Sequence, residues 1–121
     1  MTKLTKKLII FLIAVIASSL IFKPPDNSNP QLDSLKTAFN NAKHDTTKVN
    51  ILLALGEQLY ISQPDTALMY WQQALTLARK AGFKKGIAEA LGNVAYIYEK
   101  QGNPDKALEY DLECMEICKE I

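Results

Sequence analysis

The stretches SQPDTALMYWQQALTL (residues 62–77) and GNPDKALEYDLECMEI (residues 102–117) begin 40 residues apart and carry five identical residues at matching positions. In each stretch a Pro stands where a first helical residue is expected, because its fixed φ suits that position and its missing N–H is not needed there. An Asp follows in the first turn, where the helix dipole favours negative charge. A fixed repeat of this length predicts stacked helical units. The matching pairs are Pro64/Pro104, Asp65/Asp105, Ala67/Ala107, Leu68/Leu108 and Tyr70/Tyr110.

A second helical pattern lies upstream of each stretch. In both cases a small residue, Gly56 or Ala95, stands among larger apolar residues at helical spacing. Small residues let two antiparallel helices approach closely while their large neighbours fill the flanking grooves. The pattern therefore predicts two helical hairpins. Its positions are Leu52, Leu55, Gly56 and Leu59 before the first stretch, and Leu91, Val94, Ala95 and Tyr98 before the second.

The rest of the chain from residue 31 onward is also helical in pattern. Apolar residues at the three-four spacing, from Leu32 to Ala42, predict a leading helix. The turn at His44 interrupts that spacing, and Asp45 or Thr46 is expected to cap the next helix. Alternation of period two is absent from this part of the sequence, so no strand is expected. The predicted helices are 31–43, 47–61, 64–81, 86–100 and 104–120.

The two hairpins resemble the tetratricopeptide repeat, whose signature combines W-x2-L-G-x2-Y with A-x3-F. The resemblance implies an all-α fold of tandem antiparallel hairpins, an α-solenoid, over residues 31–121, with about two full repeats and a leading helix. The sequence departs from the family pattern in its longer repeat and in Asp111, which takes a position that is normally large and apolar. The residues expected to pack the repeats are Leu52, Leu55, Gly56, Leu59, Ala67, Trp71, Ala74, Leu91, Val94, Ala95, Tyr98, Ala107 and Cys114.

The N-terminal segment is different in character. Lys3, Lys6 and Lys7 precede an uncharged apolar run over residues 8–22, which ends at Lys23. This order is typical of a secretory signal peptide, and an uncleaved membrane anchor is the alternative. The run is short for an anchor, since its helix would span about 22 Å of an apolar bilayer core of about 30 Å.

Either interpretation places a hydrophobic helix ahead of the repeats and the repeats outside the cytoplasm. We therefore expect a signal peptide or anchor over residues 1–23, a polar linker over 24–30 and the helical domain over 31–121. The expected location is the periplasm, with the protein exported or tethered to the inner membrane. If the segment is uncleaved, residues 8–22 are the contact with the membrane.

Composition and motifs argue against catalysis and nucleic-acid binding. The net charge of +1 gives no basic surface for nucleic acid. The single His44 lies in a polar turn without a partner nucleophile, and no Gly-rich phosphate loop occurs. Cys114 and Cys118 share one helix face and are interpreted as packing residues, because no further ligands accompany them to bind a metal. We expect no enzymatic activity, no cofactor and no metal.

Binding to a protein or peptide is the function that the repeats favour. By resemblance to the family, the first helix of each hairpin would line a concave groove. Three glutamates among these positions would make the groove acidic; alternatively, all of them are ordinary surface residues. The candidate groove residues are Asn50, Leu53, Glu57, Tyr60, Glu89, Asn93, Tyr96 and Glu99.

The segments DTTKVN (residues 45–50) and KKGIAEALGNVAYIYEKQGN (residues 84–103) are also similar to the extracytoplasmic repeat regions of bacterial membrane-bound sensor histidine kinases and related regulators. This likeness implies the sensory part of a signalling protein. The alternatives are a truncated sensor histidine kinase without its catalytic region and an envelope assembly factor.

The C-terminal helix has apolar residues on more than one face. Tyr110, Cys114, Ile117 and Ile121 are expected to pack back on the preceding helix. Leu112, Met115 and Cys118 point elsewhere. An exposed apolar face of this kind predicts self-association, or coverage by further C-terminal sequence.

Overall fold

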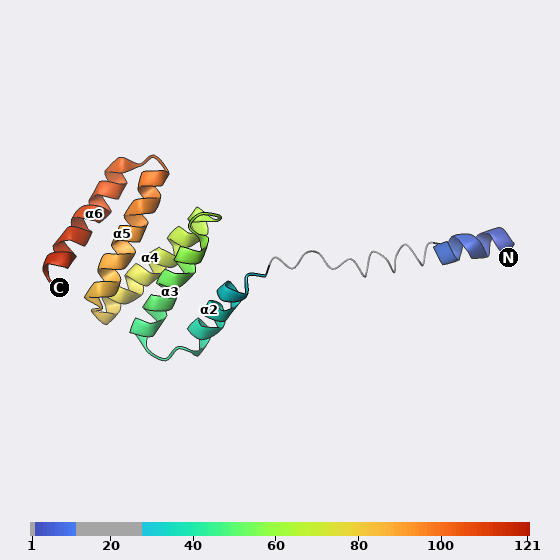
Figure 1. The fold of residues 1–121 in the computed structure, drawn as a ribbon, viewed down its shortest axis with the longest axis horizontal. Coiled ribbons are helices and arrows are strands. Elements are labelled where there is room, and N and C mark those ends of the chain that lie inside the picture. The colour runs from blue at the N-terminus through green and yellow to red at the C-terminus, as the bar shows by residue number, and fades with distance from the viewer. Residues whose placement is uncertain (1, 12–27) are drawn as a thin grey trace.

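Figure 1 shows the computed structural model, which describes residues 2–11 and 28–121. The secondary structure of these residues is entirely helical, which confirms the all-α prediction. The observed helices differ from the predicted ones by at most two residues at either end. They are α2 (Pro30–Asn41), α3 (Asp45–Leu59), α4 (Pro64–Ala81), α5 (Lys84–Lys100) and α6 (Pro104–Lys119).

The N-terminal segment is described only in part. Residues 3–11 are helical, but most of the apolar run predicted over residues 8–22 lies outside the described residues. Among the described helices, none combines the length and the apolar content needed to cross a bilayer.

Helices that are consecutive in the sequence are neighbours in space. α3 packs on α4 and α5 packs on α6, so that the chain folds into two antiparallel hairpins (Figure 1). α4 also contacts α5, which joins the hairpins, and α2 lies against α3 ahead of them. α3 and α5, the first helices of the two hairpins, touch each other directly. This is the stacking that the repeat pattern predicted.

Prolines mark three of the helix starts. Pro30, Pro64 and Pro104 are each the first residue of their helices, as the sequence predicted for the latter two. The side chain of Asn103 accepts a hydrogen bond from the backbone N–H of Lys106 at 3.2 Å and caps α6. Such a cap satisfies one of the N–H groups that have no partner within the helix.

The predicted start of α3 is wrong. The helix begins at Asp45 rather than after it, and His44 occupies the cap position without a side-chain hydrogen bond to the helix. The backbone leaves the extended conformation directly after His44, so Asp45 is already in the first turn. There its charge favours the helix through the dipole rather than through a capping bond.

Two glycines close helices in the left-handed conformation. Gly82 has a φ of 64° and Gly102 a φ of 76°, where residues with a Cβ are strained. After α4, Phe83 N–H donates to Ala78 O at 2.9 Å and Gly82 N–H donates to Arg79 O at 3.2 Å. This pair of backbone hydrogen bonds forms a Schellman motif, and α5 ends with the same pair of bonds. The sharp reversals set the antiparallel direction of the following helices.

The core is one continuous cluster built mainly by α3, α4 and α5. Almost all of the residues predicted to pack the repeats are buried in it; Tyr98 and Cys114 are half-buried at its edge. α6 contributes only Ala107 as a buried residue, and α2 contributes none. The largest fully buried side chains are Val49, Leu55, Leu91, Val94 and Ile97.

α3 and α4 are in tight contact where Gly56 meets Trp71. A Cβ added to Gly56 would lie 2.1 Å from Trp71 Nε1, far inside van der Waals contact. Only glycine leaves room for the indole at this crossing. In the second hairpin the equivalent position holds Ala95, and Asp111 stands in the place of Trp71.

We predict that Gly56→Ala destabilises the fold by about 1–3 kcal/mol, because the added methyl group must displace Trp71. Replacing Gly56 or Ala95 with leucine should overpack its hairpin and lower the stability of the fold by a similar free energy. The control is Gly92→Ala: a Cβ on this glycine within α5 meets nothing within 4 Å. That variant should be stabilised by about 0.5–1 kcal/mol. Urea denaturation followed by circular dichroism tests both changes, and equal midpoints for the two alanine variants would refute the crossing described above.

Candidate functional site

A hollow opens between α3 and α5 on the side of the molecule that these two helices share. Its volume is about 500 Å³. Glu57 comes from α3, Tyr60 directly follows α3, two residues come from α5, and Trp71 comes from α4. The lining residues are Glu57, Tyr60, Trp71, Asn93 and Tyr96. The sequence placed four of them in the candidate groove, and the structure brings these four together in one site.

The hollow has an aromatic wall. The ring centroids of Tyr60 and Trp71 are 6.2 Å apart, and those of Tyr60 and Tyr96 are 5.9 Å apart in an edge-to-face arrangement. The indole is held in place because Trp71 Nε1 donates a hydrogen bond of 3.1 Å to Leu53 O. At the rim, Lys100 Nζ lies 5.3 Å from the centroid of Tyr96. A wall of this kind offers apolar area with little loss of side-chain entropy on binding.

Asn93 supplies an unsatisfied polar group. Its side-chain nitrogen is buried and has no hydrogen-bond partner among the described residues. A buried donor without an acceptor costs about 1–3 kcal/mol, and such groups are rare in native proteins. Asn93 also lines the hollow, so the unsatisfied amide belongs to a residue of the candidate site.

The other predicted groove residues lie elsewhere. Asn50, Glu89 and Glu99 are exposed but do not line the hollow. The placement of Leu53 in the groove is wrong, because its side chain is only 3 % exposed and belongs to the core. α3 packs against α2, α4 and α5, so only part of its surface stays free. Only the carbonyl of Leu53 serves the site, by holding Trp71.

Trp71 is the lining residue that the sequence did not assign to the groove. It was expected to pack the repeats, and at 2 % exposure it does. Gly56 was nevertheless a usable signal, because a glycine on the neighbouring helix leaves room for a large ring to lie close to α3.

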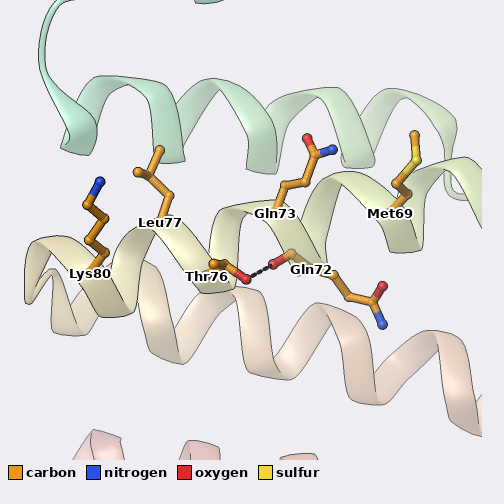
Figure 2. A pocket seen from close by; sticks show the side chains of 6 residues that line it. All are labelled: Met69, Gln72, Gln73, Thr76, Leu77 and Lys80. Carbon is orange, nitrogen blue, oxygen red and sulfur yellow. Dashed lines mark hydrogen bonds between the residues drawn. The ribbon is translucent and has the colours of Figure 1, made fainter.

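A second hollow, of about 370 Å³, runs along the outer side of α4 (Figure 2). All six lining residues come from this one helix, and Figure 2 shows the hydrogen bond from Thr76 Oγ1 to Gln72 O, 3.1 Å long. No aromatic wall and no unsatisfied donor accompany it among the described residues. It is therefore the weaker candidate.

The cysteines of α6 differ in environment. Cys114 Sγ donates to Ala88 O at 3.3 Å and is half-buried, whereas Cys118 is exposed. Burial, together with the neighbouring Cys118, raises the pKa of the Cys114 thiol. Among the described residues, no group of three or more His, Cys, Asp or Glu side chains is placed to hold a metal ion.

The fold defines a helical repeat protein, with a candidate binding surface at the first helices of its hairpins. Residues 47–120 match the tetratricopeptide repeat family, and the chain belongs to this family. Members of such arrays bind other proteins on the surface that the stacked helices present. The chain is therefore an interaction scaffold.

One curated relative is response regulator aspartate phosphatase A of Bacillus subtilis (strain 168). The two are 43% identical over 56 residues, which make up 46% of this chain and 15% of the relative. The chain thus corresponds to a small part of that protein. No solved structure matches significantly.

We predict that Trp71→Phe destabilises the protein by about 1–3 kcal/mol, because it removes a buried donor and leaves a cavity beside Gly56. Tyr98→Phe is the control, since the hydroxyl of Tyr98 makes only an exposed contact of 3.4 Å with Gln72. That change should cost less than about 0.5 kcal/mol. Thermal melting by circular dichroism measures both, and similar losses in the two variants would contradict the role given to Trp71.

Proposed function

We propose that the chain is a scaffold that binds a segment of a partner protein in the hollow between α3 and α5. The observation that carries the proposal is Asn93, which lines this hollow and whose buried side-chain nitrogen has no acceptor among the described residues. A peptide carbonyl is the acceptor that every protein segment can supply. Binding would turn the cost of the unsatisfied group into a gain.

The chemistry of the lining indicates what kind of segment fits. Tyr60, Trp71 and Tyr96 offer rings on which an apolar side chain can lie. Glu57 is the acidic residue of the lining and favours a Lys or Arg nearby in the bound segment. We expect a segment that combines an apolar anchor with a basic residue.

Asn93→Ala should weaken binding about tenfold, which corresponds to about 1.4 kcal/mol, because the ligand carbonyl loses its donor. The probes are peptides selected from a random display library on the full chain. The matched control is Asn40→Ala, the same change at an exposed position on α2. Trp71 is the single tryptophan, so its fluorescence reports occupancy of the hollow directly. Selected peptides that bind both variants equally, without changing the fluorescence of Trp71, would place the binding surface elsewhere.

A signalling role is the second part of the proposal. It is supported by the likeness to a response regulator phosphatase and by the resemblance to the repeat regions of sensor kinases. In this proposal the chain recognises a protein and does not itself catalyse a reaction. A truncated part of a sensor histidine kinase and an envelope assembly factor remain the alternatives.

We further propose that the protein is exported or tethered to the inner membrane. Lys3, Lys6 and Lys7 ahead of the apolar residues 8–22 support this. A reporter that is active only outside the cytoplasm, fused after Ile121, should be active. Val15→Arg should abolish the activity of the reporter, because a charge at the middle of the apolar run raises the free energy of membrane insertion by about 2.5–3.5 kcal/mol. A fusion that works only in the cytoplasm would contradict export, and mass spectrometry of the mature N-terminus distinguishes cleavage from anchoring.

Self-association through the C-terminal helix remains a prediction. Its apolar basis is the exposed pair Leu112 and Met115 of α6, whereas the acidic residues that flank them disfavour a symmetric contact. The expected packing of Ile121 on the preceding helix is wrong, since this residue lies beyond the end of α6 and is 71 % exposed.

A further inference from the structure

The two hairpins differ in how their second helices are covered. On α4, Trp71, Leu75 and Ala78 are all buried in the core: Trp71 packs against Gly56 of α3, and α5 packs against α4 as well. The equivalent positions on α6, 40 residues later, are Asp111, Met115 and Cys118, and all three are exposed. The first hairpin thus shows what kind of element covers this face: an antiparallel helix.

The uncovered face of α6 is apolar along its centre. Leu108, Leu112 and Met115 follow one another at spacings of four and three residues, which places them on one side of the helix. Each is more than half exposed. A contiguous row of large apolar side chains on a surface is the usual mark of an interface.

Acidic residues flank this row. Asp111 lies on one side of it, and three further carboxylates lie on the other. Of the two lysines of α6, Lys119 is paired with Glu116 at 2.9 Å, and Lys106 lies 4.6 Å from the ring centroid of Tyr98 on the far side of the helix. The flank therefore carries net negative charge. The three carboxylates are Asp105, Glu109 and Glu116.

The charge pattern distinguishes between two molecules that could cover this face: a second copy of the chain and a helix of another protein. A symmetric dimer through α6 would place the same surface of two copies face to face, so that acidic flanks would meet acidic flanks. Like charges brought together in an interface are unfavourable. A helix with a central row of apolar residues and Lys or Arg along its edges matches both the apolar row and the acidic flanks of α6.

We propose that the outer face of α6 docks an amphipathic, basic helix of another protein. Its apolar side chains would lie on Leu108, Leu112 and Met115, and a Lys or Arg would meet Asp111. This surface is separate from the hollow between α3 and α5, and the inference does not depend on the function proposed for that hollow.

Asp111 is the residue that gives this surface its specificity. A helix without a cation at this point would bury the carboxylate unpaired, which is strongly unfavourable. A basic helix is therefore the preferred occupant of this face.

The proposal is tested with two synthetic helices added to the full chain. Both have leucine along one face and are about 15 residues long, enough to form on binding. One carries lysine on its remaining positions and the other glutamate. The lysine helix should bind the chain, and the glutamate helix should not. Asp111→Lys should weaken the lysine helix at least about tenfold and allow the glutamate helix to bind, as expected for a direct charge pair.

Two controls separate docking from general attraction to acidic surfaces. Asp33→Lys makes the same change on α2 and should leave binding of the lysine helix unaltered. Met115→Ser keeps the charges of α6 and should weaken binding through loss of apolar contact. Bound helix should also slow alkylation of Cys118, while Cys114 stays slow throughout because it is half-buried.

Three results would overturn the proposal. The first is equal weakening of the lysine helix by Asp33→Lys and Asp111→Lys. The second is binding without protection of Cys118. The third is sedimentation of the full chain as a dimer whose association is abolished by Met115→Ser, which would make a second copy the occupant of this face.

Discussion

The contact of Trp71 with Gly56 determines how closely the first hairpin closes. The indole fills the space that a side chain on α3 would otherwise take, and its Nε1 donates to Leu53 O of the same helix. The ring thereby joins α3 to α4 both by packing and by a buried hydrogen bond. Because Trp71 also lines the hollow between α3 and α5, one side chain serves the core and the candidate binding surface. The geometry of the site follows from the geometry of the hairpin.

The second hairpin shows what changes when this contact is absent. Ala95 and Asp111 replace the pair of Gly56 and Trp71, and the hairpin is held instead by contacts such as the stacked rings of Tyr98 and Tyr110, whose centroids are 5.5 Å apart. An ion pair between Arg79 and Glu113 links α4 with α6 at the surface. Such exposed pairs add little stability. The outer helix is consequently less buried than its counterpart and keeps an apolar face free.

The helices could be predicted from the sequence because their signals are local. The prolines at the starts of α4 and α6 and the repeated spacing of Leu52 and Leu91 required no knowledge of the tertiary structure. The site could be predicted only in part. Leu53 has the spacing of a groove residue, but its burial depends on which helices pack against α3. Three helices do so, and Leu53 is buried. The orphan nitrogen of Asn93 could not be predicted at all, since hydrogen-bond satisfaction depends on the position of every nearby acceptor.

The leading helix α2 has a mechanical consequence for the domain. Among the described helices, it packs only against α3, and it contains no buried residue, although Leu32, Leu35 and Phe39 rest on the core. Elements with few buried apolar contacts open at a lower free energy than the whole domain. A pull applied from the N-terminal side would therefore peel α2 away first and leave both hairpins closed. The protein has an extensible link at its leading end, which can absorb strain before the candidate binding surface is disturbed.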